Sequence, residues 1–185
     1  MKNIMKVTKI ATKIAEVFHW VGAVLMLAAA VCSLAAPNMV KYFVEPDTKS
    51  GTHAEISIYG FESTSLLENG MVNMQALFLY SIGGIIILVL AAMIFRNLNL
   101  IIKKAENSTP FQQDNVRMLK EIGIFSMAMP VVGLITSIVC RLVMGVNEVE
   151  ISVNLSGFFM GLIVLCLTQF FVHGIELEKD VDGLL

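Results

Sequence analysis

Four long runs of apolar residues alternate with polar segments along this chain. The runs cover residues 14–36, 74–95, 122–140 and 155–172, and Glu16 is the only formally charged side chain inside them. A helix needs about 20 predominantly apolar residues to cross a bilayer, and a surface helix of a soluble protein has a polar face that these runs lack. The pattern predicts a bundle of four transmembrane helices in a single integral membrane domain, residues 1–185.

Composition agrees with a membrane location. Hydrophobic residues make up 56% of the chain and charged residues 15%, with a mean hydropathy of +0.76. Soluble domains carry about 25% charged residues. The first run has basic residues before it, as a secretory signal has, but it exceeds the usual 7–15 apolar residues of a signal core. We therefore interpret it as a membrane span, in contact with the lipid bilayer like the other three.

The cations between the runs predict how the helices are oriented. Four Lys precede the first run and five Lys or Arg lie in the loop 96–121, whereas the loops 37–73 and 141–154 hold only three in total. Cytoplasmic loops are enriched in Lys and Arg. We predict a multi-pass protein of the inner or plasma membrane, with both termini and the loop 96–121 in the cytoplasm and the other two loops outside.

The inner loop carries the signals of a helical hairpin. Thr109 is a candidate N-cap and Pro110 suits the first helical position, so the third helix is expected to begin near residue 110 and the second to continue past Phe95. A candidate partner-contact surface on this hairpin consists of its cations, which are Arg96, Lys103, Lys104, Arg117 and Lys120. The alternative is a solvated loop that only follows the charge rule.

The two outer loops contain short alternating patterns. Residues 54–61 and 148–156 alternate apolar and polar side chains with a period of two, which is typical of strands. Both lie on the same predicted side of the membrane. We expect them to form a small extracytoplasmic β cap over the bundle.

Two pairs of ionisable residues lie near the predicted cytoplasmic ends of the first and fourth spans. Glu16 and His19 are three residues apart, as are His173 and Glu176, so each pair shares a helix face. Ionisable groups within spans are candidate proton carriers or metal ligands. Only two helices supply them and no further carboxylate completes a di-iron pattern, so interfacial solvation is the favoured interpretation, and no metal or cofactor is predicted.

Small and helix-breaking residues mark packing positions. Gly157 and Gly161 are four residues apart, a spacing that permits close helix approach, either within the chain or between copies in a homo-oligomer. Pro130 lies in the middle of the third span and removes the hydrogen bond to the carbonyl of Ser126, so a kink is expected.

The three cysteines have no metal-binding spacing. Cys32 and Cys140 end their spans on the same predicted side, so a disulfide between them requires only that the helices touch. Buried free cysteine behaves as a small hydrophobe, and free thiols are the favoured state.

The segment "TPFQQDNVRMLKEIG" and the final span with its tail, "GFFMGLIVLCLTQFFVHGIELEKDVDGLL", resemble an uncharacterised bacterial four-helix membrane protein family, domain of unknown function 2975. The resemblance rests on a Pro-Phe…Asn-Val-x-x-Leu-x-x-Ile-Gly pattern and a Gly-x-x-Leu-x-x-Asp tail. These correspond to Pro110, Phe111, Asn115, Val116, Leu119, Ile122 and Gly123, and to Gly174, Leu177 and Asp180. It implies four spans and a helix-turn-helix transcription regulator as partner, because such proteins are often encoded beside one. It implies no activity.

Motifs for catalysis are missing from the sequence. There is no Gly-rich phosphate loop and no Gly-x-Ser-x-Gly nucleophile motif, so we predict no enzyme and no direct contact with nucleic acid. The predicted function is a non-catalytic regulatory or sensory membrane protein that engages a cytoplasmic partner. The alternative is a small transporter, channel, or efflux or immunity component, with Glu16 and His173 as proton carriers and a cavity near Pro130.

The predicted orientation can be tested by labelling a single thiol. In a variant with Cys32, Cys140 and Cys166 replaced by Ala, we expect a cysteine introduced at Ser108 to react with an impermeant maleimide only after the cells are permeabilised. Labelling of intact cells would reverse the predicted orientation.

Overall fold

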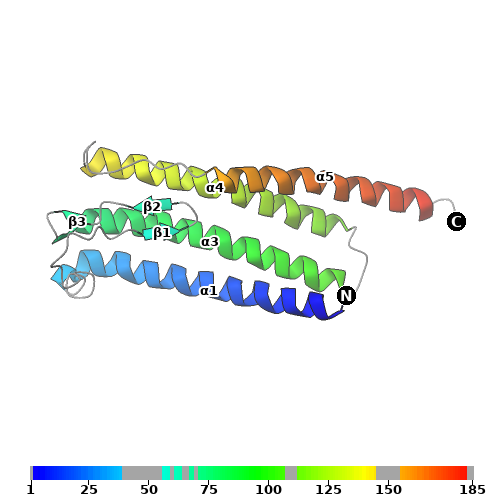
Figure 1. Cartoon of the computed structure of the whole chain (residues 1–185), viewed down its shortest axis with the longest axis horizontal. Coiled ribbons are helices and arrows are strands. Elements are labelled where there is room, and N and C mark those ends of the chain that lie inside the picture. Colours follow the sequence, from blue (N-terminus) through cyan, green and yellow to red (C-terminus); the bar gives the residue numbers. More distant parts are fainter. Residues whose placement is uncertain are drawn as a thin grey trace. The chain divides into compact units, whose positions relative to one another are not determined.

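The computed structural model describes residues 2–38, 56–58, 61–63, 67–68, 71–106, 112–144 and 155–182. Most of these residues form the helices α1 (Lys2–Ala35), α3 (Met74–Ala105), α4 (Gln113–Met144) and α5 (Ser156–Asp182) (Figure 1). All four are long and apolar enough to cross a membrane. The structure thus has the architecture of a multi-pass helical membrane protein, as the apolar runs predicted.

The predicted β cap is not supported. Strand β1 (Ile56–Ile58) pairs with β2 (Phe61–Ser63), and β3 (Leu67–Glu68) pairs with β4 (Met71–Val72), each in a separate two-stranded antiparallel ladder. The strand at 54–61 was expected to pair with residues 148–156. Of the latter, residues 148–154 lie outside the described part of the chain. Pairing strands that are close in sequence costs less loop-closure entropy than pairing strands almost a hundred residues apart. The observed ladders are therefore formed between neighbouring strands.

The helix ends follow from local capping. The Asn73 side-chain Oδ1 accepts hydrogen bonds from the backbone N–H groups of Gln75 and Ala76, both at 3.1 Å, and so caps the start of α3. At the start of α4, the Gln112 carbonyl accepts from Asn115 at 3.0 Å and Val116 at 3.1 Å. The first described turn of α4 therefore begins at Gln113, a few residues later than expected. The predicted cap Thr109 lies outside the described residues.

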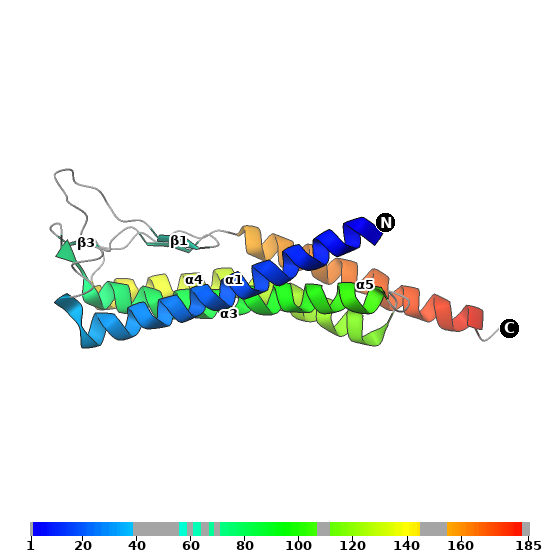
Figure 2. The same ribbon diagram turned by 90° about the horizontal axis from the view of Figure 1, so that it is seen from below.

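The chain divides into two compact units, each cutting across helices. The first unit comprises Met1–His19, Leu90–Ala128 and Ser156–Leu185, and the second comprises Trp20–Val89 and Met129–Leu155. The first unit contains the basic ends of α1, α3 and α4 together with all of α5, which continues as one helix to Asp182 (Figure 2). The predicted contact cations all belong to the first unit.

Much of the apolar surface faces outward. Half of the most apolar stretch of α3 is buried, against 11% of the corresponding stretch of α5. Large side chains such as Phe18, Phe159 and Phe170 are 74%, 59% and 72% exposed. Soluble monomers rarely expose an apolar surface of this extent. It suggests a lipid bilayer environment around the helices.

Glycine permits α5 to lie against α4 in the first unit. A Cβ atom at Gly161 would lie 2.6 Å from the backbone oxygen of Gly123 and 3.1 Å from the backbone nitrogen of Met127. Neither backbone atom can move without shifting its helix. Gly161 therefore serves packing within the chain, while its predicted companion Gly157 is only half-buried.

In the second unit, α4 is helical through Pro130, and the predicted kink remains a prediction.

All three cysteines are free thiols, Cys140 buried and Cys32 exposed. The structure therefore has no disulfide between Cys32 and Cys140.

The α4–α5 contact can be tested with two matched glycine substitutions. We expect Gly161→Ala to lower the free energy of unfolding by about 1–3 kcal/mol, because the added methyl group overpacks against backbone. Gly22→Ala is the control, because a Cβ there would meet Leu88 at an ordinary 3.4 Å. Its effect should stay within about 1 kcal/mol. Unfolding in mixed micelles, followed by circular dichroism, measures both, and equal effects would contradict the close contact.

Candidate functional site

The four helices extend past their apolar runs at one common end, in the first unit. Helix α1 begins at Lys2, before the run at 14–36, and α3 continues through residues 96–105 after its run. Helix α4 begins at Gln113 before the run at 122–140, and α5 continues to Asp182. At 1.5 Å per residue these extensions reach roughly 15 Å beyond the apolar runs. Polar side chains can join the helices there, and they do so between α1 and α3 and between α3 and α4.

Helix α1 is joined to α3 by a short hydrogen-bond network. The side-chain amide of Asn99 donates to the backbone carbonyl of Lys9 at 2.9 Å and to the hydroxyl of Thr12 at 3.1 Å. About two turns further along, Glu106, the residue directly after α3, forms an ion pair of 2.5 Å with Lys9. Asn99 and Glu106 are seven residues apart, and their contacts fix the register of α3 against α1.

Helix α3 is joined to α4 in the same manner. The buried Asn97 amide donates to Glu121 at 2.9 Å, and Lys104 forms a 2.5 Å ion pair with Asp114. Arg117 reaches Glu121 from within α4 at 3.5 Å. The joining residues together form what we call the polar collar, which consists of Lys9, Thr12, Asn97, Asn99, Lys104, Glu106, Asp114 and Glu121.

The predicted contact cations lie on two helix faces beside the collar. Arg96 and Lys103 are exposed and lie seven residues apart, on one face of α3. Arg117 and Lys120 are exposed and three residues apart, on one face of α4. Lys104 forms an ion pair with Asp114, so it belongs to the collar as much as to a contact surface.

Glu16 and His19 are buried in the first unit, each 8% exposed. Lys13 forms a 3.0 Å ion pair with Glu16, and the carbonyl oxygen of Ala15 accepts a hydrogen bond from His19 Nδ1 at 2.6 Å. The His19 ring stacks on Phe95 with ring centroids 5.1 Å apart. Glu16 thus has a structural partner on α1, and His19 has partners on α1 and α3.

His173 and Glu176 form a separate exposed pair on α5, 3.3 Å apart. They do not join Glu16 and His19, because α5 is displaced along α4. If the apolar runs of α4 and α5 were aligned, Val172 at the end of one run would lie level with Ile122 at the start of the other. Val172 instead shares a cleft with Val116. Helix α5 is therefore displaced along α4 by roughly two helical turns. The described residues contain no group of three or more His, Cys, Asp or Glu side chains that could hold a metal ion.

Sequence reasoning missed the collar, although the sequence contains a signal for it. Asn97 and Lys104 are seven residues apart on α3, and Asp114 and Glu121 are seven apart on α4. Two donors and two acceptors at heptad spacing can meet in register when the helices are antiparallel. The pairing of Asn99 with α1 has no comparable signal, because its main acceptor is a backbone carbonyl.

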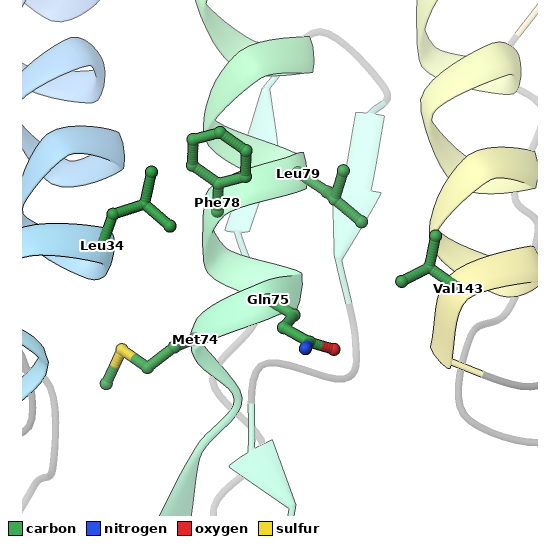
Figure 3. Close-up of a pocket in the computed structure, with 6 residues that line it drawn as sticks. All are labelled: Leu34, Met74, Gln75, Phe78, Leu79 and Val143. Atoms are coloured by element: carbon green, nitrogen blue, oxygen red, sulfur yellow. The ribbon is translucent and has the colours of Figure 1, made fainter.

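The second unit has a different hollow, at the other end of α3. A cavity of about 230 Å³ is lined by Leu34 of α1, Val143 of α4 and four residues of α3 (Figure 3). Leu34 points from α1 toward α3, and the surface of the hollow is almost wholly apolar, although Gln75 is among the residues that line it. An apolar hollow with no charged group offers a place for a lipid chain and no evident chemistry.

No protein-family model, curated protein or solved structure matches the chain. The resemblance to the bacterial family, the regulator partner and the absence of catalysis therefore remain predictions from the residues.

Double-mutant cycles can rank the contacts of the collar. We expect a coupling of about 1.5–3 kcal/mol for Asn97 with Glu121, because one partner is charged and the other buried. The exposed pair Lys104 with Asp114 should couple more weakly, because water and salt screen it. Alanine substitutions and unfolding in micelles measure both, and 1 M salt should weaken only the exposed pair. The reverse ranking would contradict the role given to Asn97.

Proposed function

We propose that this chain is a non-catalytic regulatory or sensory protein of the bacterial cell membrane, which engages a cytoplasmic partner through its basic end. The observation that carries the proposal is the polar collar. It joins α1, α3 and α4 beyond their apolar runs, and so presents Arg96 and Lys103 on an ordered helix rather than in a loop. This arrangement favours an interaction surface over the solvated-loop alternative, since a loop that only follows the charge rule needs no interhelical contacts.

The proposal places this surface in the cytoplasm, together with both termini. The basis is the excess of cations in the segments that form the basic end. The resemblance to the bacterial family suggests a helix-turn-helix transcription regulator as the partner. Such a partner would meet the cations with acidic side chains, because complementary charge steers association and selects partners.

The alternative transporter function gains no support from the positions of its proposed proton carriers. Glu16 is buried beside Lys13 on α1, whereas His173 is exposed on α5 and pairs with Glu176. A proton path through both would have to cross the offset between the two pairs.

Co-purification tests the partner surface. When the tagged full chain is co-expressed with the regulator encoded beside it, we expect Arg96→Glu/Lys103→Glu to abolish capture of the regulator, because like charges would then face each other. Lys41→Glu/Lys49→Glu makes the same change of charge in the loop predicted on the opposite side, and it should leave capture unchanged.

Two measurements make the result decisive. Thiol labelling at position 108 verifies that the variant keeps the orientation of the parent chain. Intact capture by a correctly oriented Arg96→Glu/Lys103→Glu variant would overturn the proposed surface, and so would equal losses in both double variants.

A further inference from the structure

The first unit contains a cleft between α4 and α5 that the proposed function does not use. Its volume is about 400 Å³, and its walls come from the first turns of α4 and from residues 172–179 of α5. The floor is apolar and consists of Val116, Val172 and Ile175. Its rim carries Arg117, Lys120 and Lys179, all exposed. An apolar floor under three cations is an amphipathic site.

The rim has an excess of positive charge. Lys120 and Lys179 form no ion pair within the described part of the chain, and Arg117 has a 3.5 Å contact with Glu121 and a charge interaction with Asp114, both at the surface. Glu176 is the one carboxylate of the lining, and it lies 3.3 Å from His173. The cleft therefore retains cations to bind an anion.

The offset of α5 determines the surroundings of these cations. Because Gly161 packs on Gly123 and Val172 lies in the cleft beside Val116, the last turns of the apolar run of α5 are level with the polar first turns of α4. Leu167 and Phe170, in those turns of α5, are 49% and 72% exposed. Cations and exposed apolar side chains thus lie at the same level along the helices. This is the situation at the boundary between hydrocarbon and headgroups, where Lys and Arg extend toward phosphate.

We propose that the α4–α5 cleft binds one anionic phospholipid of the adjacent leaflet. The phosphate lies between Arg117, Lys120 and Lys179, and an acyl chain follows Val116, Val172 and Ile175 onto the exposed face of α5. Guanidinium groups bind phosphate oxygens through two parallel hydrogen bonds, and basic pockets between transmembrane helices suit anionic headgroups. A soluble anion would use the rim and leave the floor uncovered, whereas a phospholipid satisfies both. The positive excess selects an anionic lipid over a zwitterionic one.

Native mass spectrometry of the full chain tests the proposal. The probes are phosphatidylglycerol and phosphatidylcholine with identical acyl chains, titrated into the protein in detergent. We expect one phosphatidylglycerol to be retained in preference to phosphatidylcholine, and Lys120→Gln/Lys179→Gln to weaken that binding by roughly tenfold or more. Arg96→Gln/Lys103→Gln removes the same charge from α3, away from the cleft, and should leave the affinity unchanged.

Three results would overturn the proposal. They are equal retention of the two lipids, equal losses in the two double variants, and displacement of phosphatidylglycerol by a water-soluble oligoglutamate peptide, which would assign the cleft to an acidic protein segment. The lysines of the cleft variant are exposed, so the variant should fold like the parent chain, and circular dichroism verifies this. Lipid binding does not depend on the regulator, so failure here and failure of the partner surface can be told apart.

Discussion

Inside the hydrocarbon of a bilayer, backbone N–H and C=O groups find no water, so every one of them must be satisfied within the protein. The described chain meets this demand with long unbroken helices, and its polar side chains within the spans obey the same constraint. The hydroxyls of Ser81, Ser137 and Thr168 donate to carbonyls four residues earlier in their own helices, at 2.7, 3.0 and 2.8 Å. These three hydroxyls are therefore satisfied within their own helices and join no two spans.

The consequence is a division between two kinds of helix contact. Within the apolar runs, helices approach where a side chain is absent, as at Gly161 against Gly123 in the first unit and Gly83 against Thr136 in the second. Beyond the runs, the polar collar joins α1, α3 and α4 by directed hydrogen bonds and ion pairs. Hydrogen bonds to charged groups are worth more than neutral ones, so the collar specifies the register that apolar packing leaves loosely determined.

Helix α5 has no residue in the collar, and this distinguishes it from the other three. Its contact with α4 consists of a close glycine approach and an apolar seam, and most of its surface is exposed. The two proposed surfaces follow from this difference. The collar presents the α3 cations Arg96 and Lys103 on an ordered helix, while the offset of α5 brings an apolar face beside Arg117 and Lys120. The same loop cations that indicate orientation would then divide between a protein partner and a phospholipid.

The sequence by itself determined the number, approximate positions and apolar character of the helices, because 20-residue apolar runs have one stable solution in lipid. It also contained the seven-residue spacing shared by the donors Asn97 and Lys104 on α3 and the acceptors Asp114 and Glu121 on α4. Only the tertiary structure decided the offset of α5, the separation of Glu16 and His19 from His173 and Glu176, and the commitment of Lys104 to Asp114. Apolar surfaces can slide past one another at little cost, so the position of α5 depends on where Gly161 meets α4. The contact of Gly161 with α4 cannot be predicted from any periodic pattern in the sequence.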